Sequence, residues 1–361
     1  MTAIYITEPE AVLKVHRHKF QVFRQHTLHL NVPVRQTSQI IAFAGTHLQR
    51  QAAFAAQQNR IPVLFLERDG RYLGRLEIES QQPAKHQAHQ MKRSADTEYS
   101  RAVAESAVRA KLHNCSALLL QLTSAHCTPA AKFALDALAL IMEDLPAANS
   151  ITNLREYQAT GATFYYRALT ELLASAFYFQ QPSCWQSAAP IHALLRVSNA
   201  FLQQAVWGLA LAKGLHPGLG HLHAGSEEEM GLIKDLAAEW SPVIADKLIA
   251  ELVYGQIITP QDIAPPNGRP HTAIQPHALK TVAESWEKKM QMPVTCRCSG
   301  EISYRQYLEL QVLEYIASLR GDVECYRPAL VQLSALPVFE GGGFLSGENR
   351  QVIAHTKKAG F

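Results

Sequence analysis

The stretch that decides how the fold begins is residues 61–74, Ile-Pro-Val-Leu-Phe-Leu-Glu-Arg-Asp-Gly-Arg-Tyr-Leu-Gly. The apolar run Ile61–Leu66 is typical of a buried strand. Asp69 and Gly70 favour a tight hairpin turn, because glycine readily adopts the positive φ that this turn requires. Tyr72–Gly74 then begins a returning strand. The stretch therefore predicts a β-hairpin.

The residues upstream of this hairpin predict further strands and one helix. Ala3–Thr7 and Gln39–Ala44 are rich in β-branched and apolar side chains, and Gly45 ends the second run. Leu48–Gln58 contains neither Gly nor Pro and is rich in Ala and Gln, which favours a helix. We therefore assign residues 1–82 to a small β-rich domain.

The pattern changes after residue 82. Residues 83–95 contain Pro, His and Gln and predict a linker. From residue 96 to residue 330 the apolar residues recur at helical spacing. The predicted helices are Ser100–Leu112, Thr128–Met142, Asn153–Ser175, Ala193–Lys213, Leu232–Tyr254, Leu279–Lys289 and Tyr304–Leu319. We expect an α+β fold in which the β-rich domain precedes a larger all-helical one. Residues 331–361 carry little pattern and are a candidate for disorder.

Composition narrows the class of protein. The chain has 361 residues, of which 47% are apolar and 18% charged, so it can build a large core and is not a disordered chain. Its formal charge of +3 excludes a polybasic tail but not a basic patch. No apolar run approaches the roughly 18 residues that span a bilayer, and Met1–Glu8 has no secretory pattern. We expect a cytoplasmic protein without a membrane segment, and its scattered cysteines predict reduced thiols.

The densest group of polar residues lies between positions 216 and 246. His221 and His223 end a Gly/Pro-rich segment, and Asp235 and Glu239 share one face of the following predicted helix. Imidazole and carboxylate ligands together suit Mn²⁺ or Mg²⁺. A solvated helix face behind a turn is the structural alternative. A helical metallohydrolase that uses the two histidines and the acidic run 227–229 is another, although it leaves the N-terminal motifs unexplained.

Several motifs follow one another in a familiar order. Besides the strands above, these are Ala110–Asn114, Leu154–Arg155 with Gly161–Ala162, Gly214–His223, Asp235–Leu236 with Pro242, and Gln311 with Tyr326–Pro328. In this order the sequence resembles the CRISPR-associated protein one family, the endonuclease/integrases of CRISPR spacer acquisition in antiviral defence. The resemblance covers residues 3–330 and implies the two-domain α+β architecture.

The resemblance implies a metal-dependent reaction in which a DNA 3′ hydroxyl attacks a phosphodiester of the CRISPR repeat. A Glu, a His and a second acidic residue hold Mn²⁺ or Mg²⁺ in that family. Carried over by position, the His falls on His223, whereas the Glu falls on Gln158 and the second acid on Ala238. Asp235 is then the surviving acid, and Glu239 is a further candidate ligand. We therefore expect weak or absent integrase activity, with a catalytically silent DNA-binding or scaffolding homologue as the alternative.

The resemblance also implies partners. It predicts a homodimer formed through the β-rich domain, double-stranded DNA (protospacer and CRISPR repeat), and the CRISPR-associated protein two as a bridging subunit. Basic side chains that can contact DNA phosphates are Lys111, Arg269, Lys288, Lys289 and Arg305. A solvated basic face is the structural alternative for these five residues.

Overall fold

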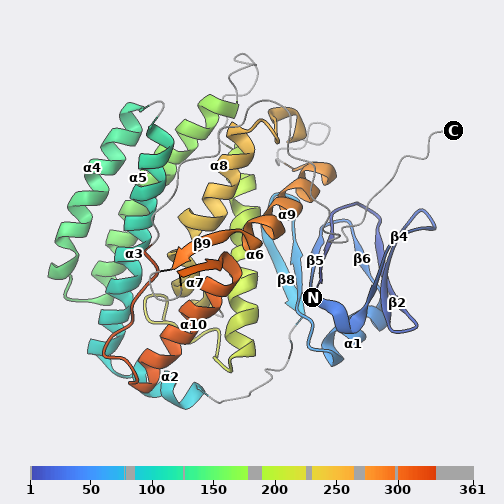
Figure 1. The fold of residues 1–361 in the computed structure, drawn as a ribbon, viewed down its shortest axis with the longest axis horizontal. Helices are drawn as coiled ribbons and strands as arrows, with labels where there is room; N and C mark the ends of the chain where they lie inside the picture. Colours follow the sequence, from blue (N-terminus) through green and yellow to red (C-terminus); the bar gives the residue numbers. More distant parts are fainter. Residues whose placement is uncertain are drawn as a thin grey trace. The chain divides into compact units, whose positions relative to one another are not determined.

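The computed structural model describes residues 2–76, 78, 86–124, 127–177, 189–224, 230–263, 273–296 and 300–330 (Figure 1). Two compact units make up the chain. The first contains Met1–Ser80 and Ile258–Ser285, and the second contains Gln81–Ile257 and Trp286–Pro337. The β-rich N-terminal part and the mostly helical C-terminal part of the predicted α+β fold are both present.

The predicted hairpin is one end of a four-stranded sheet in the first unit. Strands β7 Val63–Leu66 and β8 Tyr72–Leu76 pair antiparallel, and Gly70 in their turn has a φ of 84°. The sheet order is β1-β5-β7-β8. Strand β5 Thr37–Phe43 runs parallel to both β1 Thr2–Ile6 and β7. The helix α1 Arg50–Gln58 connects the second sheet to β7.

A second sheet, in the order β4-β3-β2-β6, is absent from the sequence prediction. Its strands are β2 Val12–His16, β3 Lys19–Arg24, β4 Thr27–Pro33 and β6 His47–Leu48. The two turns between β2, β3 and β4 place Arg17, His18, Gln25 and His26 at positive φ. Those turns contain no Gly, Asn or Asp, so the usual hairpin signal is missing from the sequence.

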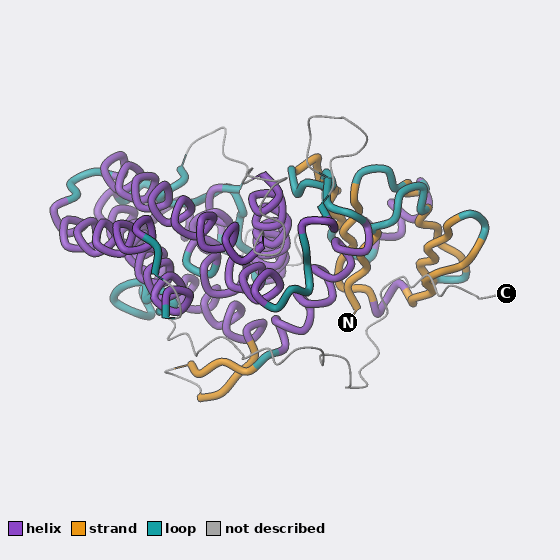
Figure 2. Tube along the Cα trace, turned by 90° about the horizontal axis from the view of Figure 1, so that it is seen from above, coloured by secondary structure: helices purple, strands orange, loops and turns teal. Residues whose placement is uncertain are grey.

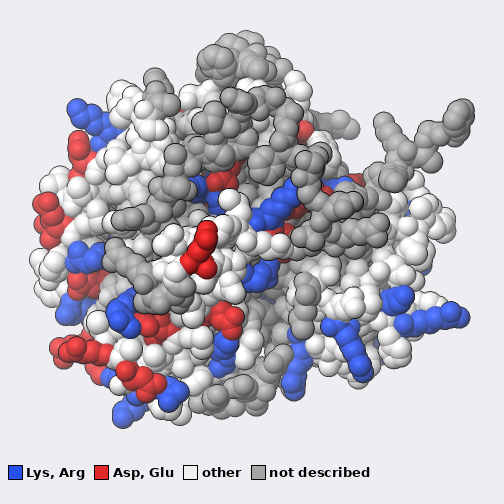
Figure 3. Space-filling view, viewed as in Figure 1, with Lys and Arg blue, Asp and Glu red and all other residues white. Residues whose placement is uncertain are grey.

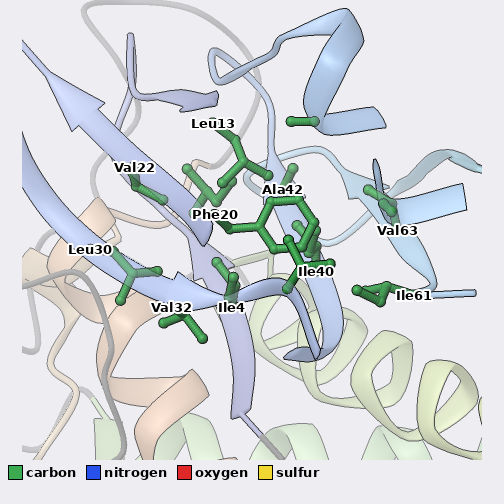
Figure 4. Packing of buried hydrophobic residues seen from close by; sticks show 14 of the residues in the cluster. Ile4, Leu13, Phe20, Val22, Leu30, Val32, Ile40, Ala42, Ile61 and Val63 are labelled. Atoms are coloured by element: carbon green, nitrogen blue, oxygen red, sulfur yellow. The ribbon is translucent and has the colours of Figure 1, made fainter. Parts of the chain in front are cut away.

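The two sheets share an apolar core (Figure 4). Phe20 and Leu13 from the second sheet lie against Ile4, Ile40 and the other inward side chains of the first, and all four named residues are fully buried. The alternation of buried and exposed positions along β3 matches the two-residue period of a strand. Burial of this apolar surface stabilises the unit.

Residues 258–285 belong to the first unit, although the sequence placed them in the helical domain. The physical reason is a two-way contact with the segment after β7. Arg68 Nη2 donates to the Ile274 carbonyl at 3.0 Å, and Ile274 N–H donates to the Arg68 carbonyl at 3.2 Å. A short 3₁₀ turn, η4 Pro260–Asp262, lies in the same segment.

The mostly helical part contains longer helices than the sequence predicts. They are α2 Gln87–Ser94, α3 Thr97–Thr123, α4 Pro129–Asp144, α5 Ile151–Phe177, α6 Ala189–Ala212 and α10 Tyr304–Arg320. The helix α9 Pro276–Gln291 begins in the first unit and ends in the second. Residues 87–94, predicted as linker, form α2, whose Gln90 bonds to the backbone of His216. Thr128 caps α4 through the Ala131 N–H, as its position before Pro129 predicts.

Two features correct the all-helical prediction for this part. Strands β9 Pro293–Cys296 and β10 Gly300–Ser303 form a short antiparallel ribbon, the orange strands at the bottom of Figure 2. The predicted helix 232–254 is divided into α7 Gly231–Ala238, a π-helical turn η3 Ser241–Asp246 and α8 Lys247–Tyr254. Pro242 explains the break, because it has no N–H to donate within a helix.

None of the described helices combines the length and the apolar character needed to span a membrane. The predicted tail 331–361 lies outside the described residues.

Candidate functional site

A pocket of about 510 Å³ in the helical unit brings the predicted ligand positions together. Gln158 reaches it from α5, His223 from the loop after α6, and Ala238 from the end of α7. Its basic lining residues are Lys111, Arg196 and Lys234. The remaining lining residues are Tyr166, His192, Leu195, Asn199, Gln203, Ala237 and Ser241. Residues far apart in the sequence therefore meet at one solvent-accessible site.

Asp235 shapes the loop that carries His223. Its carboxylate accepts the backbone N–H groups of His221 at 2.6 Å, Leu222 at 3.0 Å and His223 at 3.1 Å. The side chain is buried, with 4% of its surface exposed. Three backbone donors converge on one carboxylate, which fixes the loop conformation.

The same carboxylate orients the His223 ring. Nδ1 of His223 lies 2.7 Å from Asp235 Oδ1. Since the carboxylate is an acceptor, Nδ1 carries the proton and the other ring nitrogen, Nε2, is left for a ligand. Asp235 is absent from the described residues that line the pocket. Asp235 therefore positions His223, in contrast to the expectation that it is itself a ligand.

Two glycines allow the loop to approach α7. A Cβ built on Gly220 would lie 2.5 Å from the Gly231 carbonyl carbon and 2.8 Å from Asp235 Oδ2. A Cβ on Gly231 would lie 2.1 Å from the His223 carbonyl oxygen. Only glycine avoids these clashes, so the contact between Asp235 and the loop requires both residues.

Helix α5 holds the loop from the other side. Arg155 donates to the carbonyls of Leu222 at 2.5 Å and Ala224 at 3.0 Å. Gln158 follows Arg155 by nearly one helical turn, so it lies on the same side of α5. One helix, α5, therefore positions both Arg155, which holds the loop, and Gln158, which lines the pocket.

Gln158 occupies the position at which the resemblance expects a glutamate. Its side chain is only 8% exposed, and the described residues offer no hydrogen-bond partner to its Nε2. An amide has one acceptor oxygen and a donor nitrogen, whereas a carboxylate has two acceptor oxygens and a negative charge. Compared with the glutamate that the resemblance implies, Gln158 carries no negative charge and adds an N–H donor.

Glu239, the further candidate ligand, points into a separate buried network. Its Oε1 accepts the Tyr326 hydroxyl at 2.8 Å and its Oε2 accepts the Ala329 N–H at 3.0 Å. Burial raises the pKa of Glu239 to about 8, although both hydrogen bonds oppose the shift. Because both oxygens are engaged there, Glu239 is not combined with His223.

Several residues of the sequence motifs take part in this network. Asn114 Nδ2 donates to the carbonyls of Glu239 and Ala329, and Gln311 Nε2 donates to the Tyr326 hydroxyl. Asn114, Gln311 and Tyr326 are all motif residues, and their contacts tie residues 326–329 to α3, α7 and α10. Their role in this structure is to hold the fold around the pocket.

A second buried carboxylate, Asp246, contacts two residues that line the pocket, Asn199 and Ser241. Asp246 accepts from Tyr165 Oη at 2.9 Å, Asn199 Nδ2 at 3.0 Å and Ser241 Oγ at 3.4 Å. Burial raises the pKa of Asp246 to about 6, and these donors hold it lower than burial alone would. This network was not predicted from the sequence.

The donors in the pocket do not fit a divalent cation. His223 supplies one imidazole, Gln158 a neutral amide, and Ala238 no donor. Across the part of the chain that the structure describes, no group of three or more His, Cys, Asp and Glu side chains is arranged to hold a metal ion. Hard cations of the Mg²⁺ and Mn²⁺ type prefer carboxylate oxygens. The expected Mn²⁺ or Mg²⁺ site is therefore incomplete.

Comparison with known proteins gives the family. Residues 4–288 match the family described as "CRISPR associated protein Cas1". The chain belongs to the Cas1 family. It is 26% identical over 311 residues to "CRISPR-associated endonuclease Cas1 2" of Rhodospirillum rubrum, covering 82% of this chain and 89% of that protein. Membership supports a place in the CRISPR adaptation integrase family.

Solved structures show the same fold. A chain of a "Cas6-RT-Cas1--Cas2 complex" has a TM-score of 0.78 at 15% identity, and the match covers 92% of this chain and 36% of that one. A "Casposase bound to integration product" has a TM-score of 0.76 at 14% identity, and the match covers 91% of this chain and 94% of that one. The α+β architecture is thus shared with Cas1 proteins and a casposase.

His221 lies beside the pocket but is engaged elsewhere, which bears on the metallohydrolase alternative. Its ring contacts Ser100 Oγ at 3.0 Å and Tyr315 Oη at 2.9 Å. Burial lowers the pKa of His221, so the neutral imidazole is favoured. The acidic run 227–229 lies outside the described residues. The described residues therefore give that alternative no support.

The basic DNA-contact candidates in this Cas1 homologue have different environments. Lys111 lines the pocket, and Lys288 is exposed. Lys289 is 2% exposed and pairs with Glu251 at 2.7 Å, so its ammonium is not available to a phosphate. Arg305 is half-exposed and pairs with Glu287 at 2.9 Å. Arg269 lies outside the described residues.

Proposed function

We propose that this chain acts in CRISPR adaptation as a DNA-binding Cas1 homologue whose metal-dependent strand transfer is weak or lost. The observation that carries this proposal is the pocket itself. His223 is retained and oriented by Asp235, whereas Gln158 and Ala238 stand where carboxylates are expected. Without those carboxylates the pocket lacks the charge that holds a dication beside the reacting phosphodiester.

A basic groove in the β-sheet unit supports the DNA-binding part of the proposal. The groove measures about 1320 Å³, and Arg17, Lys19, Arg35 and Arg50 are its charged lining residues. None of the described residues that line it is acidic. On the face drawn in Figure 3, blue Lys and Arg side chains outnumber red carboxylates in the region that β2, β4 and α1 occupy in Figure 1. Such a surface attracts the phosphates of duplex DNA.

The proposed partners follow from the relatives. One structural neighbour is part of a Cas1–Cas2 complex and another is bound to an integration product. We therefore propose that this chain binds protospacer and repeat DNA together with a Cas2 protein. We also propose that it forms a homodimer through the β-sheet unit, as the family resemblance implies.

Strand transfer tests the proposed loss of activity. Purified protein, its Cas2 protein, a labelled protospacer duplex and a supercoiled plasmid with a repeat are incubated with Mn²⁺. We expect the wild-type chain to give at most about 1% of the joined product formed by the double variant Gln158→Glu/Ala238→Glu. This roughly 100-fold difference in rate corresponds to an activation barrier about 2.7 kcal/mol higher in the wild-type chain. His223→Ala in the double variant should abolish that product.

Either of two results would overturn the proposal. Efficient joining by the wild-type chain, lost on His223→Ala, would show that the existing residues suffice for strand transfer. Failure of the wild-type chain to bind the protospacer duplex at low salt would remove the DNA-binding role. Circular dichroism of each variant shows whether the fold is retained.

A further inference from the structure

We propose that the pocket binds a phosphate group directly, without a divalent cation, using the Gln158 amide and the surrounding cationic side chains. This inference rests on the proposed function, because the phosphate would be one of DNA. With an amide and a methyl group in place of two carboxylates, the pocket has fewer acceptor oxygens and less negative charge, and it gains an N–H donor. A site that lacks the charge to attract a dication can instead attract an anion.

The charge of the lining favours an anion. Lys111 on α3, Arg196 on α6 and Lys234 on α7 approach the pocket from three different helices. No Asp or Glu is among the described lining residues. Cations on separate rigid elements can surround a phosphate, and the attraction is stronger where water is partly excluded.

The Gln158 amide supplies a donor that has no protein partner. Its Nε2 is buried and unpaired among the described residues, at the wall of the same pocket. An unpaired buried N–H donor costs about 1–3 kcal/mol, so a ligand that accepts from it gains affinity. A phosphate oxygen is such an acceptor. A Glu at this position would repel the same group.

His223 can contribute a further donor. Asp235 lies behind the ring, on Nδ1, so Nε2 is the nitrogen that faces a ligand. When both ring nitrogens carry a hydrogen, Nδ1 donates to Asp235 and Nε2 can donate to a phosphate oxygen. Asp235 itself is engaged by three backbone N–H groups and is not among the described residues that line the pocket.

The buried Asp246 carboxylate contacts Asn199 and Ser241, which line the pocket, and is not itself among the described lining residues. Tyr165, Asn199 and Ser241 all donate to Asp246. Burial lowers the pKa of Lys111, and the nearby Asp246 charge opposes that shift. A bound phosphate would likewise favour the charged ammonium of Lys111.

The test measures binding of inorganic phosphate and of a short duplex DNA by the full chain, in buffer with excess EDTA. Calorimetry gives the phosphate affinity, and competition by phosphate against labelled duplex shows whether both occupy one site. We expect Gln158→Glu to weaken phosphate binding about tenfold or more, because it adds a negative charge within a few ångströms of the ligand. Arg196→Gln should weaken it as well.

Thr160→Glu is the matched control. Thr160 lies two residues further along α5, is exposed and does not line the pocket, so the same charge added there should leave phosphate binding within about twofold. Loss of phosphate binding on Gln158→Glu alone, with phosphate competing against DNA, supports the proposal. Loss without competition against DNA would show a phosphate site that is not used for DNA, and would overturn the DNA source of the ligand.

Two other outcomes overturn the proposal entirely. One is no measurable phosphate binding in EDTA, and the other is equal weakening by Gln158→Glu and Thr160→Glu. Neither outcome contradicts the proposed function, because strand transfer and salt-dependent DNA binding are measured in separate experiments. Conversely, efficient strand transfer by the wild-type chain would remove the proposed function whatever the phosphate result.

Discussion

The direction in which a carboxylate points decides its role in this protein. Asp235, Glu239 and Asp246 are all buried, and each is engaged by hydrogen-bond donors from the protein. The spacing of Asp235 and Glu239 along the helical segment predicts ligands, yet spacing alone does not reveal whether an oxygen faces the pocket or the protein. The two positions that do face the pocket, Gln158 and Ala238, carry no charge.

At the residue scale, Glu239 predicts a measurable pH dependence of stability. Its pKa is raised from 4.5 to about 8, so between those values the folded protein holds a proton that the unfolded chain has released. The free energy of unfolding should therefore fall as the pH rises through this window, by an amount of the order of a few kcal/mol, and level off above pH 8.

The measurement compares wild type with Glu239→Gln by chemical denaturation between pH 5 and pH 9. We expect the stability of wild type relative to the variant to decrease with rising pH. The pKa of Asp246 is also raised, so this residue too makes the free energy of unfolding fall with rising pH below pH 6. Asp246 is present in both proteins, so its contribution cancels in the comparison. A difference that does not change with pH would contradict the assigned environment of Glu239.

At the scale of elements, the loop before α7 depends on close backbone contact. Asp235 can reach three successive N–H groups only because Gly220 and Gly231 leave space between the loop and the helix. Arg155 fixes the loop carbonyls from α5. The position of His223 is therefore set by its own loop, by the following helix α7 and by the distant helix α5.

We predict that Gly220→Ala destabilises the protein by about 2 kcal/mol or more and displaces His223, since its Cβ would overlap the Gly231 backbone. Gly208→Ala on α6 is the matched control. A Cβ there meets nothing within 4 Å, so alanine should stabilise the helix by up to about 1 kcal/mol. Thermal unfolding measures both, and equal effects of the two substitutions would refute the close contact.

The sequence predicted elements best where local chemistry is strong. The Asp69–Gly70 turn and the Thr128 cap are correct because one or two residues determine each of them. The strands around the Arg17–His18 turn were missed because long-range pairing holds that turn at positive φ without a glycine. Family resemblance placed the pocket positions 158, 223 and 238, but the orientation of Asp235 emerges only from tertiary contacts.

For the whole molecule, two sites have a basic lining. One is the basic groove of the β-sheet unit, and the other is the cation-lined pocket of the helical unit. Each site is described within its own unit, and neither has an acidic residue among its described lining. The small net charge of +3 conceals this pattern, because positive charge is concentrated locally.

Mn²⁺ binding tests the central claim most directly, namely that this Cas1 homologue has kept the pocket but lost its metal centre. Calorimetry would compare the wild-type chain with Gln158→Glu/Ala238→Glu at neutral pH, with His223→Ala in the double variant as the control. We predict that the double variant binds Mn²⁺ at least about 100-fold more tightly than wild type, a difference of about 2.7 kcal/mol, and that the control loses this gain. Equal Mn²⁺ affinity in the wild-type chain and the double variant would contradict the account.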